Sequence, residues 1–320
     1  MLKNYWLKAG YKVILTHSAL RKIAKVKLFS TPPLSQFSQS KPRNPADARG
    51  PEAARSSLPA APSAVRISQI SRLAKAGRWR VEAMRARSEP CLLWFTRGQG
   101  RITLGGVTRG YGPNNVIFIP AGVMHSYELG SQPQGQIVHF GRDSDVVLPH
   151  AIQHLRVRDG VAQGEIGSII EAVQRELDSD RPAADRALQH QLGLLSVWLE
   201  RQIASNQTAA IQPSGARRLV ARFTTLVERN FRSGIGVGEM ADELGVTLTH
   251  LTRACRESCN KGASEMLQER RLYEARELLR DTKLPVKEIA ASLGYTSPAY
   301  FTRAFHAKTG KTPIDFRRTG

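Results

Sequence analysis

The chain has 320 residues, of which 47 are Lys or Arg and 27 are Asp or Glu, giving a formal net charge of +20 with 41% hydrophobic residues. This length predicts two or three folded units, and no run approaches the ~20 apolar residues of a membrane-spanning helix, which argues against an integral membrane protein. The three cysteines are too few for a disulfide framework, which favours a cytoplasmic location, and the charge favours nucleic acid as a partner.

Residues 1–63 read as a basic extension that we expect to be disordered. Residues 1–60 contain 11 Lys and Arg against 2 Asp and Glu. Residues 30–63 are rich in Pro, Ser, Ala and Gln, and such a composition buries too little apolar surface to offset the entropy lost on folding. The extension is either dispensable or a basic arm that adds non-specific affinity for DNA.

Short apolar runs separated by glycines predict a small β domain over residues 64–145. Six glycines lie between positions 98 and 112, and closely spaced strands with glycine-rich turns are typical of an antiparallel barrel or jelly roll. The predicted strands are Trp79–Val81, Leu92–Phe95, Arg101–Leu104, Val116–Ile119 and Gln136–Phe140.

The segment Pro120 to His125 resembles the second signature of the cupin family, Pro-x-Gly-x-x-His. A catalytic metal needs three or four converging ligands, and residues 89–100, where the other cupin ligands belong, contain no histidine. We therefore expect no metal, cofactor or catalytic residue. If the β domain of residues 64–145 binds an effector, six of its residues are candidates for lining the pocket: Trp79, Trp94, Arg101, His125, Tyr127 and His139.

Residues 146–211 change to helical periodicity. Apolar residues from Ile166 to Leu177 follow the i, i+3, i+4 spacing of one helix face. A second stripe can form the seam of a helix pair between two copies of the chain, or pack back on the β domain; the two uses are compatible. The candidate dimerisation residues are Leu188, Leu192, Leu195 and Leu199.

Residues 212–320 contain an internal duplication. The block Ala241–Val246 recurs at Ala290–Tyr295, an offset of 49 residues, and Leu251–Ala254 recurs at Phe301–Ala304, an offset of 50. Each copy predicts a helix, a tight turn at a glycine and a second helix, capped by Thr247 in one copy and Ser297 in the other. A long helix over residues 263–280 joins the copies. Two helix-turn-helix units on one rigid helix can place their second helices in successive major grooves of DNA.

The second copy carries a specific resemblance, from Gly294 to Phe305 and from Gly310 to Arg317, to the AraC/XylS family of transcription regulators. The resemblance covers about residues 214–318, and it implies a cupin-like effector domain followed by a dimerising helix pair. Carried over by position, the DNA-binding residues are Thr249, His250, Thr252, Arg253, Ala299, Thr302, Arg303 and His306. Arginine can contact guanine or phosphate, and threonine can contact a thymine methyl or phosphate.

The sequence as a whole is interpreted as a multidomain α and β protein, with a cupin-like β domain and helix pair followed by an all-α domain. The expected function is a sequence-specific DNA-binding transcription regulator, most simply an effector-responsive activator and not an enzyme. Its expected partners are double-stranded promoter DNA, a small-molecule effector, a second copy of the chain and RNA polymerase. The alternative is a cupin-type metal-dependent enzyme fused to a DNA-binding module.

Overall fold

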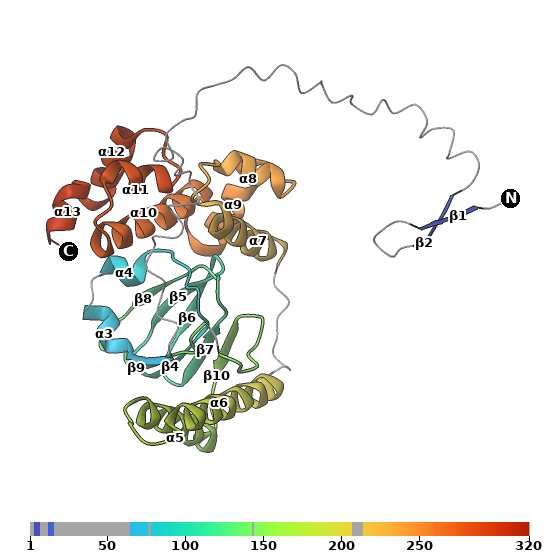
Figure 1. Ribbon diagram of the computed structural model, residues 1–320, viewed down its shortest axis with the longest axis vertical. Helices are drawn as coiled ribbons and strands as arrows, with labels where there is room; N and C mark the ends of the chain where they lie inside the picture. The colour runs from blue at the N-terminus through green and yellow to red at the C-terminus, as the bar shows by residue number, and fades with distance from the viewer. Residues whose placement is uncertain are drawn as a thin grey trace, which may run out of the picture. The chain divides into compact units, whose positions relative to one another are not determined.

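The computed structural model of the chain describes residues 3–6, 12–15, 65–75, 78–142, 144–206 and 214–319 (Figure 1). The chain divides into two units, Met1–Arg49 and Gly50–Gly320. In the first unit, β1 (Lys3–Trp6) and β2 (Lys12–Leu15) pair antiparallel, which the composition of this segment did not indicate. The disorder expected for the rest of residues 1–63 concerns positions outside the described residues.

The β domain consists of two antiparallel sheets, as the sequence predicts. One has the strand order β10-β7-β4-β9-β3 and the other β6-β5-β8. Four predicted strands are confirmed: β4, β5 and β7 have wider bounds than predicted, and β9 begins two residues earlier and ends one residue earlier. The strands are β3 (Arg66–Gln69), β4 (Cys91–Arg97), β5 (Gly100–Leu104), β6 (Val107–Tyr111), β7 (Asn115–Ile119), β8 (His125–Leu129), β9 (Gln134–His139) and β10 (Gln153–Arg156).

The five-stranded sheet is covered on both faces. Helices α5 (Gly160–Leu177) and α6 (Ala184–Asn206) lie against its outer face, where Leu92 and Phe118 pack with Ile166 (Figure 1). On the inner face, alternate residues such as Ile117 pack against the three-stranded sheet. Every residue of β7 is therefore buried, because successive side chains of a strand point to opposite faces.

The prediction of a strand at Trp79–Val81 is wrong, because this segment belongs to a short helix, α4 (Arg78–Glu82). Helix α3 (Ile70–Lys75) precedes it. The helical conformation lets Val81 pack into the β domain while Trp79 contacts Tyr273 and Phe316 of the helical domain, with ring centroids 5.9 Å apart in each pair. A three-residue apolar run does not reveal this division of contacts between two domains.

The helical domain confirms the duplicated helix-turn-helix. Thr247 and Ser297 cap α9 and α12 with their side chains, and Gly245 and Gly294 have φ angles of 72° and 76° at the turns. No helix in the described part of the chain is long and apolar enough to cross a membrane. The helices are α7 (Gly215–Asn230), α8 (Val237–Glu243), α9 (Leu248–Cys259), α10 (Ala263–Asp281), α11 (Val286–Ser292), α12 (Pro298–Thr309) and α13 (Pro313–Thr319).

Helix α10 is joined to α7 by buried ion pairs. Arg270, which is 4% exposed, donates to Glu228 of α7 at 2.6 and 3.0 Å and to Glu274 at 2.9 Å. Arg271 donates to the carbonyl oxygens of Phe231 and Ile235 at 2.7 and 3.1 Å, just beyond α7. Charge-assisted bonds of this kind fix orientation, so α10 is held firmly on α7. On the side of the second unit, the Arg271 guanidinium lies 5.8 Å from the ring centroid of Tyr295.

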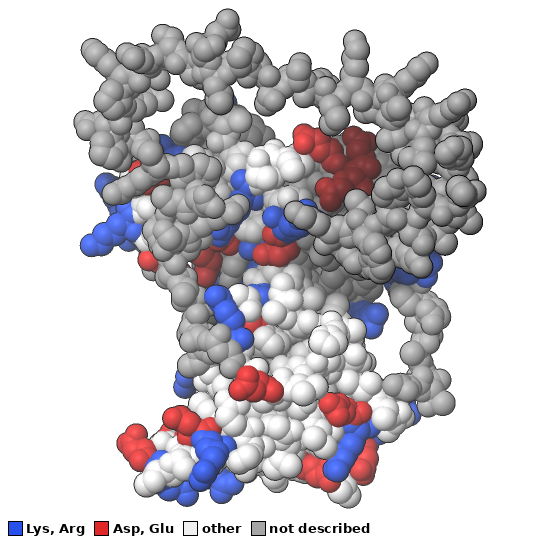
Figure 2. All heavy atoms as spheres, turned by 45° about the vertical axis from the view of Figure 1, so that its right-hand side comes forward, with Lys and Arg blue, Asp and Glu red and all other residues white. Residues whose placement is uncertain are grey.

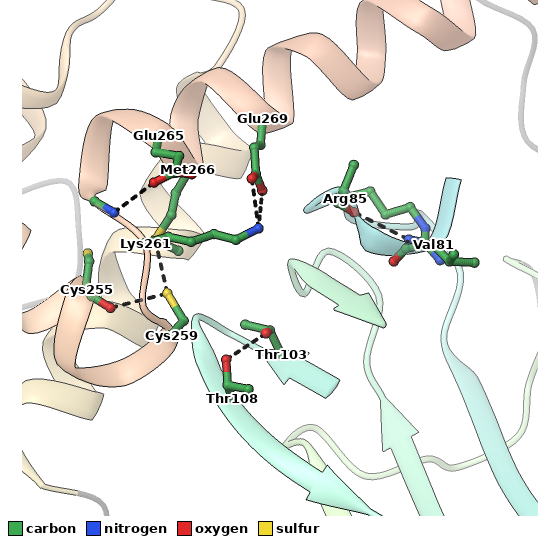
Figure 3. A network of polar contacts seen from close by, with 12 residues as sticks. Val81, Arg85, Thr103, Thr108, Cys255, Cys259, Lys261, Glu265, Met266 and Glu269 are labelled. Carbon is green, nitrogen blue, oxygen red and sulfur yellow. Dashed lines mark hydrogen bonds and ion pairs between the residues drawn. The ribbon is translucent and has the colours of Figure 1, made fainter. Parts of the chain in front are cut away.

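The β domain and the helical domain share one hydrophobic core. Met84 and Met124 of the β domain are buried in the same cluster as Val220 and Met266 of the helical domain. The turn between β5 and β6 enters this interface at Gly106, where an added Cβ would lie 2.3 Å from Val220 Cγ1. Figure 3 shows this hairpin, with Thr103 and Thr108, beside the end of α9. The domains are therefore packed against each other and not merely linked.

Candidate nucleic-acid interface

Helix α9 presents one buried and one exposed face. Thr247 Oγ1 accepts a hydrogen bond from the His250 N–H at 3.2 Å and so fixes where the helix begins. The side chains of Leu251, Ala254 and Cys255 are buried. The 3.6-residue period then turns the predicted DNA-binding residues outward: Thr249, His250 and Arg253 are exposed, and Thr252 is half-buried.

Helix α12 repeats this arrangement in the second unit. Ser297 Oγ accepts from the Tyr300 N–H at 3.3 Å, and Pro298 occupies the first helical position. Phe301 and Phe305 fill the core. The predicted residues Ala299, Arg303 and His306 are exposed, and Thr302 is half-buried.

The arginines at matching positions of the two helices are available for a ligand. The Arg253 side chain is 70% exposed and its Nε lies 3.8 Å from Glu257, which is itself 60% exposed. Exposed pairs of this kind contribute little energy and exchange readily. Arg303 is exposed and makes no ion pair with another described residue. A polyanion can therefore contact both guanidinium groups at little cost.

Two exposed side chains on these helices were not predicted. Leu248, at the start of α9, is 46% exposed, and Tyr300, near the start of α12, is 51% exposed. Tyr300 lies 50 residues after His250, which was predicted to bind DNA, so the offset of the duplication could have identified Tyr300 as its counterpart on α12. A hollow runs along α9 between Leu248 and Glu257, and it is lined by Leu248, Thr249, Thr252, Arg253, Arg256 and Glu257.

On the face seen in Figure 2, the end of the β domain that carries α5 and α6 does not concentrate positive charge. In Figure 2 the lower end of the molecule, where Figure 1 places α5 and α6, carries Lys and Arg intermixed with Asp and Glu. Mixed charge gives no strong field for a polyanion. The helical domain, by contrast, exposes Arg253 and Arg303 on α9 and α12.

The six candidate pocket residues do not form one site. Trp94 packs against α5, where an added Cβ on Gly167 would lie 3.3 Å from its ring. The Arg101 side chain is 64% exposed and 4.0 Å from Glu128. Trp79 packs on the helical domain, as described above. These three side chains lie apart from one another.

The other three, His125, Tyr127 and His139, are buried close together. His125 and Tyr127 have ring centroids 5.4 Å apart, and His139 Nδ1 lies 3.3 Å from Glu89 Oε1. Burial, together with neighbouring arginines, lowers the pKa of both histidines, that of His139 to about 3. Both imidazoles are therefore neutral near pH 7. Among the described residues, no three His, Cys, Asp or Glu side chains are grouped so as to hold a metal ion.

Sequence reasoning missed three charged residues beside these rings. Arg85 and Glu89 are 2% and 3% exposed, and the Arg87 side chain is 32% exposed. Their neighbours in sequence show no periodicity, and Arg85 is placed by backbone bonds with His125 at 3.0 and 2.7 Å. These residues come together only in the folded chain, so their spacing in the sequence could not predict that they would be neighbours.

The leucines considered for dimerisation pack within the chain. Leu192, Leu195 and Leu199 are completely buried and Leu188 is partly buried, all against the β domain and α5. Of the two predicted roles of this leucine stripe, the structure therefore shows packing against the β domain. The outer side of α6 exposes Leu194 by 54% and Val197 by 42%. A contact between two copies of the chain through α6 would therefore involve Leu194 and Val197.

Comparisons with known proteins match both folded parts of the chain. Residues 72–196 match the model of an AraC-like ligand binding domain, and residues 240–319 match that of a helix-turn-helix domain. The probable transcription factor PqrA of Proteus vulgaris is 32% identical over 96 residues, which cover 30% of this chain and 77% of PqrA.

Other relatives are matched over part of their length. The uncharacterized regulator YfiF of Bacillus subtilis is 31% identical over 126 residues, 39% of each chain. The chain spans only about two fifths of YfiF and 38% of the Msm operon regulatory protein of Streptococcus mutans. Among solved structures, ToxT of Vibrio cholerae aligns with 79% of this chain and 96% of its own at 12% identity and a TM-score of 0.39.

Proposed function

Because this chain belongs to the AraC family of transcription regulators, we propose that it binds promoter DNA in a sequence-specific manner and regulates transcription. One observation carries the proposal. Helices α9 and α12 are capped alike and expose an arginine at matching positions, Arg253 and Arg303, in a domain whose two units both contact α10. That arrangement suits two successive major-groove faces, about one helical turn of DNA apart.

The two helices offer different chemistry to DNA. Arg253 is flanked on α9 by Thr249 and Thr252, so this helix can combine an arginine contact to guanine with methyl contacts to thymine. On α12, Arg303 is accompanied by Ala299 and by Thr302, whose hydroxyl already donates to the Pro298 carbonyl at 3.0 Å. We therefore assign most base reading to α9 and a larger share of phosphate contacts to α12.

The β domain is proposed to receive a small-molecule effector and to act on the helical domain through the shared core. Met84, Met124 and Trp79 are the side chains that connect the two. A homodimer is proposed through the outer side of α6. If the protein is an activator, it would also contact RNA polymerase. Binding to promoter DNA would require the protein to be in the cytoplasm.

The DNA interface is tested by selecting binding sites from a random duplex library and titrating them in gel-shift assays. Arg253→Ala is expected to weaken binding by ~1–3 kcal/mol and to relax the preference at one base pair. Arg303→Ala is expected to weaken binding across sequences and to reduce its salt dependence. Arg181→Ala is the control, because Arg181 is 69% exposed and paired with Glu176 at 2.7 Å in the region of α5 and α6. Unchanged affinity in Arg253→Ala would refute the assignment.

A further inference from the structure

An ion pair on the exposed face of α9 sets this helix apart from α12. Arg253 Nε lies 3.8 Å from Glu257 Oε1, and both residues line the hollow that runs along α9. They stand at positions i and i+4, so their side chains leave the same face of the helix. The side chains are 70% and 60% exposed, so DNA that contacts Arg253 also meets the carboxylate of Glu257.

The second unit has the arginine without the acid. Helices α9 and α12 both have 12 residues. Arg303 follows Arg253 by 50 residues, and Ala307 follows Glu257 by the same distance. Ala307 is exposed, and Arg303 makes no ion pair within the part of the chain that the structure describes. The duplication therefore supplies an internal comparison between an arginine with a carboxylate beside it and one without.

The position of the carboxylate leaves the outer end of Arg253 free. A guanidinium group donates from Nε and from both Nη atoms, in a planar fork. Glu257 approaches the Nε side, and no further ion pair joins Arg253 to a described residue. The two Nη groups can therefore donate together to O6 and N7 of a guanine, which is the contact by which arginine distinguishes this base.

The carboxylate also changes what Arg253 attracts. Together, the guanidinium and the carboxylate carry no net charge, so a phosphate group near them is repelled by Glu257 as well as attracted by Arg253. In water such an exposed pair is weak. DNA that excludes water from the face of α9 lowers the local dielectric and strengthens the pair. Pairing therefore favours a directional contact with a base edge over a contact with phosphate.

We propose that Glu257 is a specificity-determining residue that positions Arg253 to read a guanine. Arg303, which lacks such a partner, remains free to bind phosphate. The inference rests on the proposed function and gives a physical cause for the different roles assigned above to α9 and α12. Glu257 acts through Arg253 and needs no contact of its own with DNA, so it is a positioning residue.

The experiment compares the wild-type chain with Glu257→Gln, which removes the charge and keeps the shape. Binding sites are selected from a random duplex library, and the base pair read by Arg253 is the one whose preference is lost in Arg253→Ala. Gel-shift titrations then use the selected duplex, the same duplex with adenine in place of that guanine, and an unrelated duplex, each at several salt concentrations.

Two changes are expected in Glu257→Gln. The preference for guanine over adenine should fall by about threefold or more, because the guanidinium is no longer held in place. The slope of log K against log salt should become steeper by about 0.9, because Arg253 is then free to contact a phosphate. A merely structural role of Glu257 would instead weaken binding to all three duplexes alike and leave the slope unchanged, and this result would overturn the proposal.

Further variants test whether Glu257 acts through the arginine. In the Arg253→Ala background, Glu257→Gln is expected to leave every base preference unchanged. Ala307→Glu should place the same restraint on Arg303 and make the salt slope shallower by about 0.9. Glu171→Gln, which removes an exposed acid on α5, is the control for the change in net charge.

The outcomes distinguish failure of this inference from failure of the proposed function. If the wild-type chain selects no sequence, both fail. If it selects a guanine that depends on Arg253, and Glu257→Gln keeps the full preference for it, only the role of Glu257 is refuted. Loss of preference at a different base pair would show that Glu257 itself accepts a hydrogen bond from a cytosine, which also refutes the positioning role.

Discussion

His139 shows how burial of one side chain makes stability depend on pH. It is 3% exposed, and burial together with Arg87 and Arg66 lowers its pKa from 6.5 to about 3. The unfolded chain therefore takes up a proton below pH 6.5 that the folded chain takes up only near pH 3. Unfolding binds protons in this window, so the stability of the fold falls as the pH is lowered.

We expect the free energy of unfolding to decrease from pH 6.5 downward, above the range in which carboxylates titrate. In His139→Gln, part of this decrease should disappear, because glutamine does not titrate. Urea unfolding at a series of pH values measures it, with His190→Gln as the control, since His190 is exposed on α6. An identical pH profile in His139→Gln and the wild-type chain would contradict the assignment.

At the scale of the elements, the duplication made the helical domain predictable. Repeated glycines and apolar positions predicted α8, α9, α11 and α12, and the caps Thr247 and Ser297 marked where α9 and α12 begin. The exposed positions of α9 and α12 followed from the same period. Four strands of the β domain were predicted from apolar runs bounded by glycine.

The elements that the sequence did not reveal depend on contacts distant along the chain. Helix α4 is short and its apolar residues serve two domains, so no single period describes it. Arg85 and Glu89 lie beside His125 and His139 only because contacts distant along the chain bring them together. The leucine stripe of α6 was seen, but its period fits an intramolecular and an intermolecular partner equally.

Helix α6 provides two adjacent leucines that test the proposed dimer. Leu194 is 54% exposed, and Leu195 is completely buried. Leu194→Glu is expected to shift the chain toward monomer in sedimentation experiments without lowering Tm. Leu195→Glu is expected to destabilise the fold itself, because it buries a charge without a partner. If Leu194→Glu sediments as the wild-type chain does, α6 does not form the dimer contact.

At the scale of the whole molecule, the turn between β5 and β6 is one of the contacts between the β domain and the helical domain. Gly105 and Gly106 both have positive φ, of 54° and 74°. A Cβ on Gly105 would meet only ordinary contacts, the nearest at 3.5 Å, whereas one on Gly106 would lie 2.3 Å from Val220 Cγ1 and 3.0 Å from Thr224 Cγ2. Both glycines therefore need a positive φ, but only Gly106 is in close contact with α7.

Alanine at either position should cost about 1–2 kcal/mol for the left-handed backbone. Only Gly106→Ala is expected to loosen the interface, because its methyl group collides with α7. When the two variants are compared under conditions that give them the same free energy of unfolding, amide hydrogen exchange in α7 should be faster in Gly106→Ala than in Gly105→Ala. Equal exchange in the two variants would mean that this turn does not hold the domains together.

The docking of Trp79 gives the molecule a built-in optical probe. The indole lies against Tyr273 and Phe316, with the guanidinium groups of Arg80, Arg276 and Arg280 within 5.2–6.0 Å of its ring. Trp94 and Trp198 instead lie between the sheet and α5, away from the helical domain. Separation of the domains would move Trp79 from this cationic, aromatic setting into water and change its emission, so fluorescence can follow domain motion without an added label.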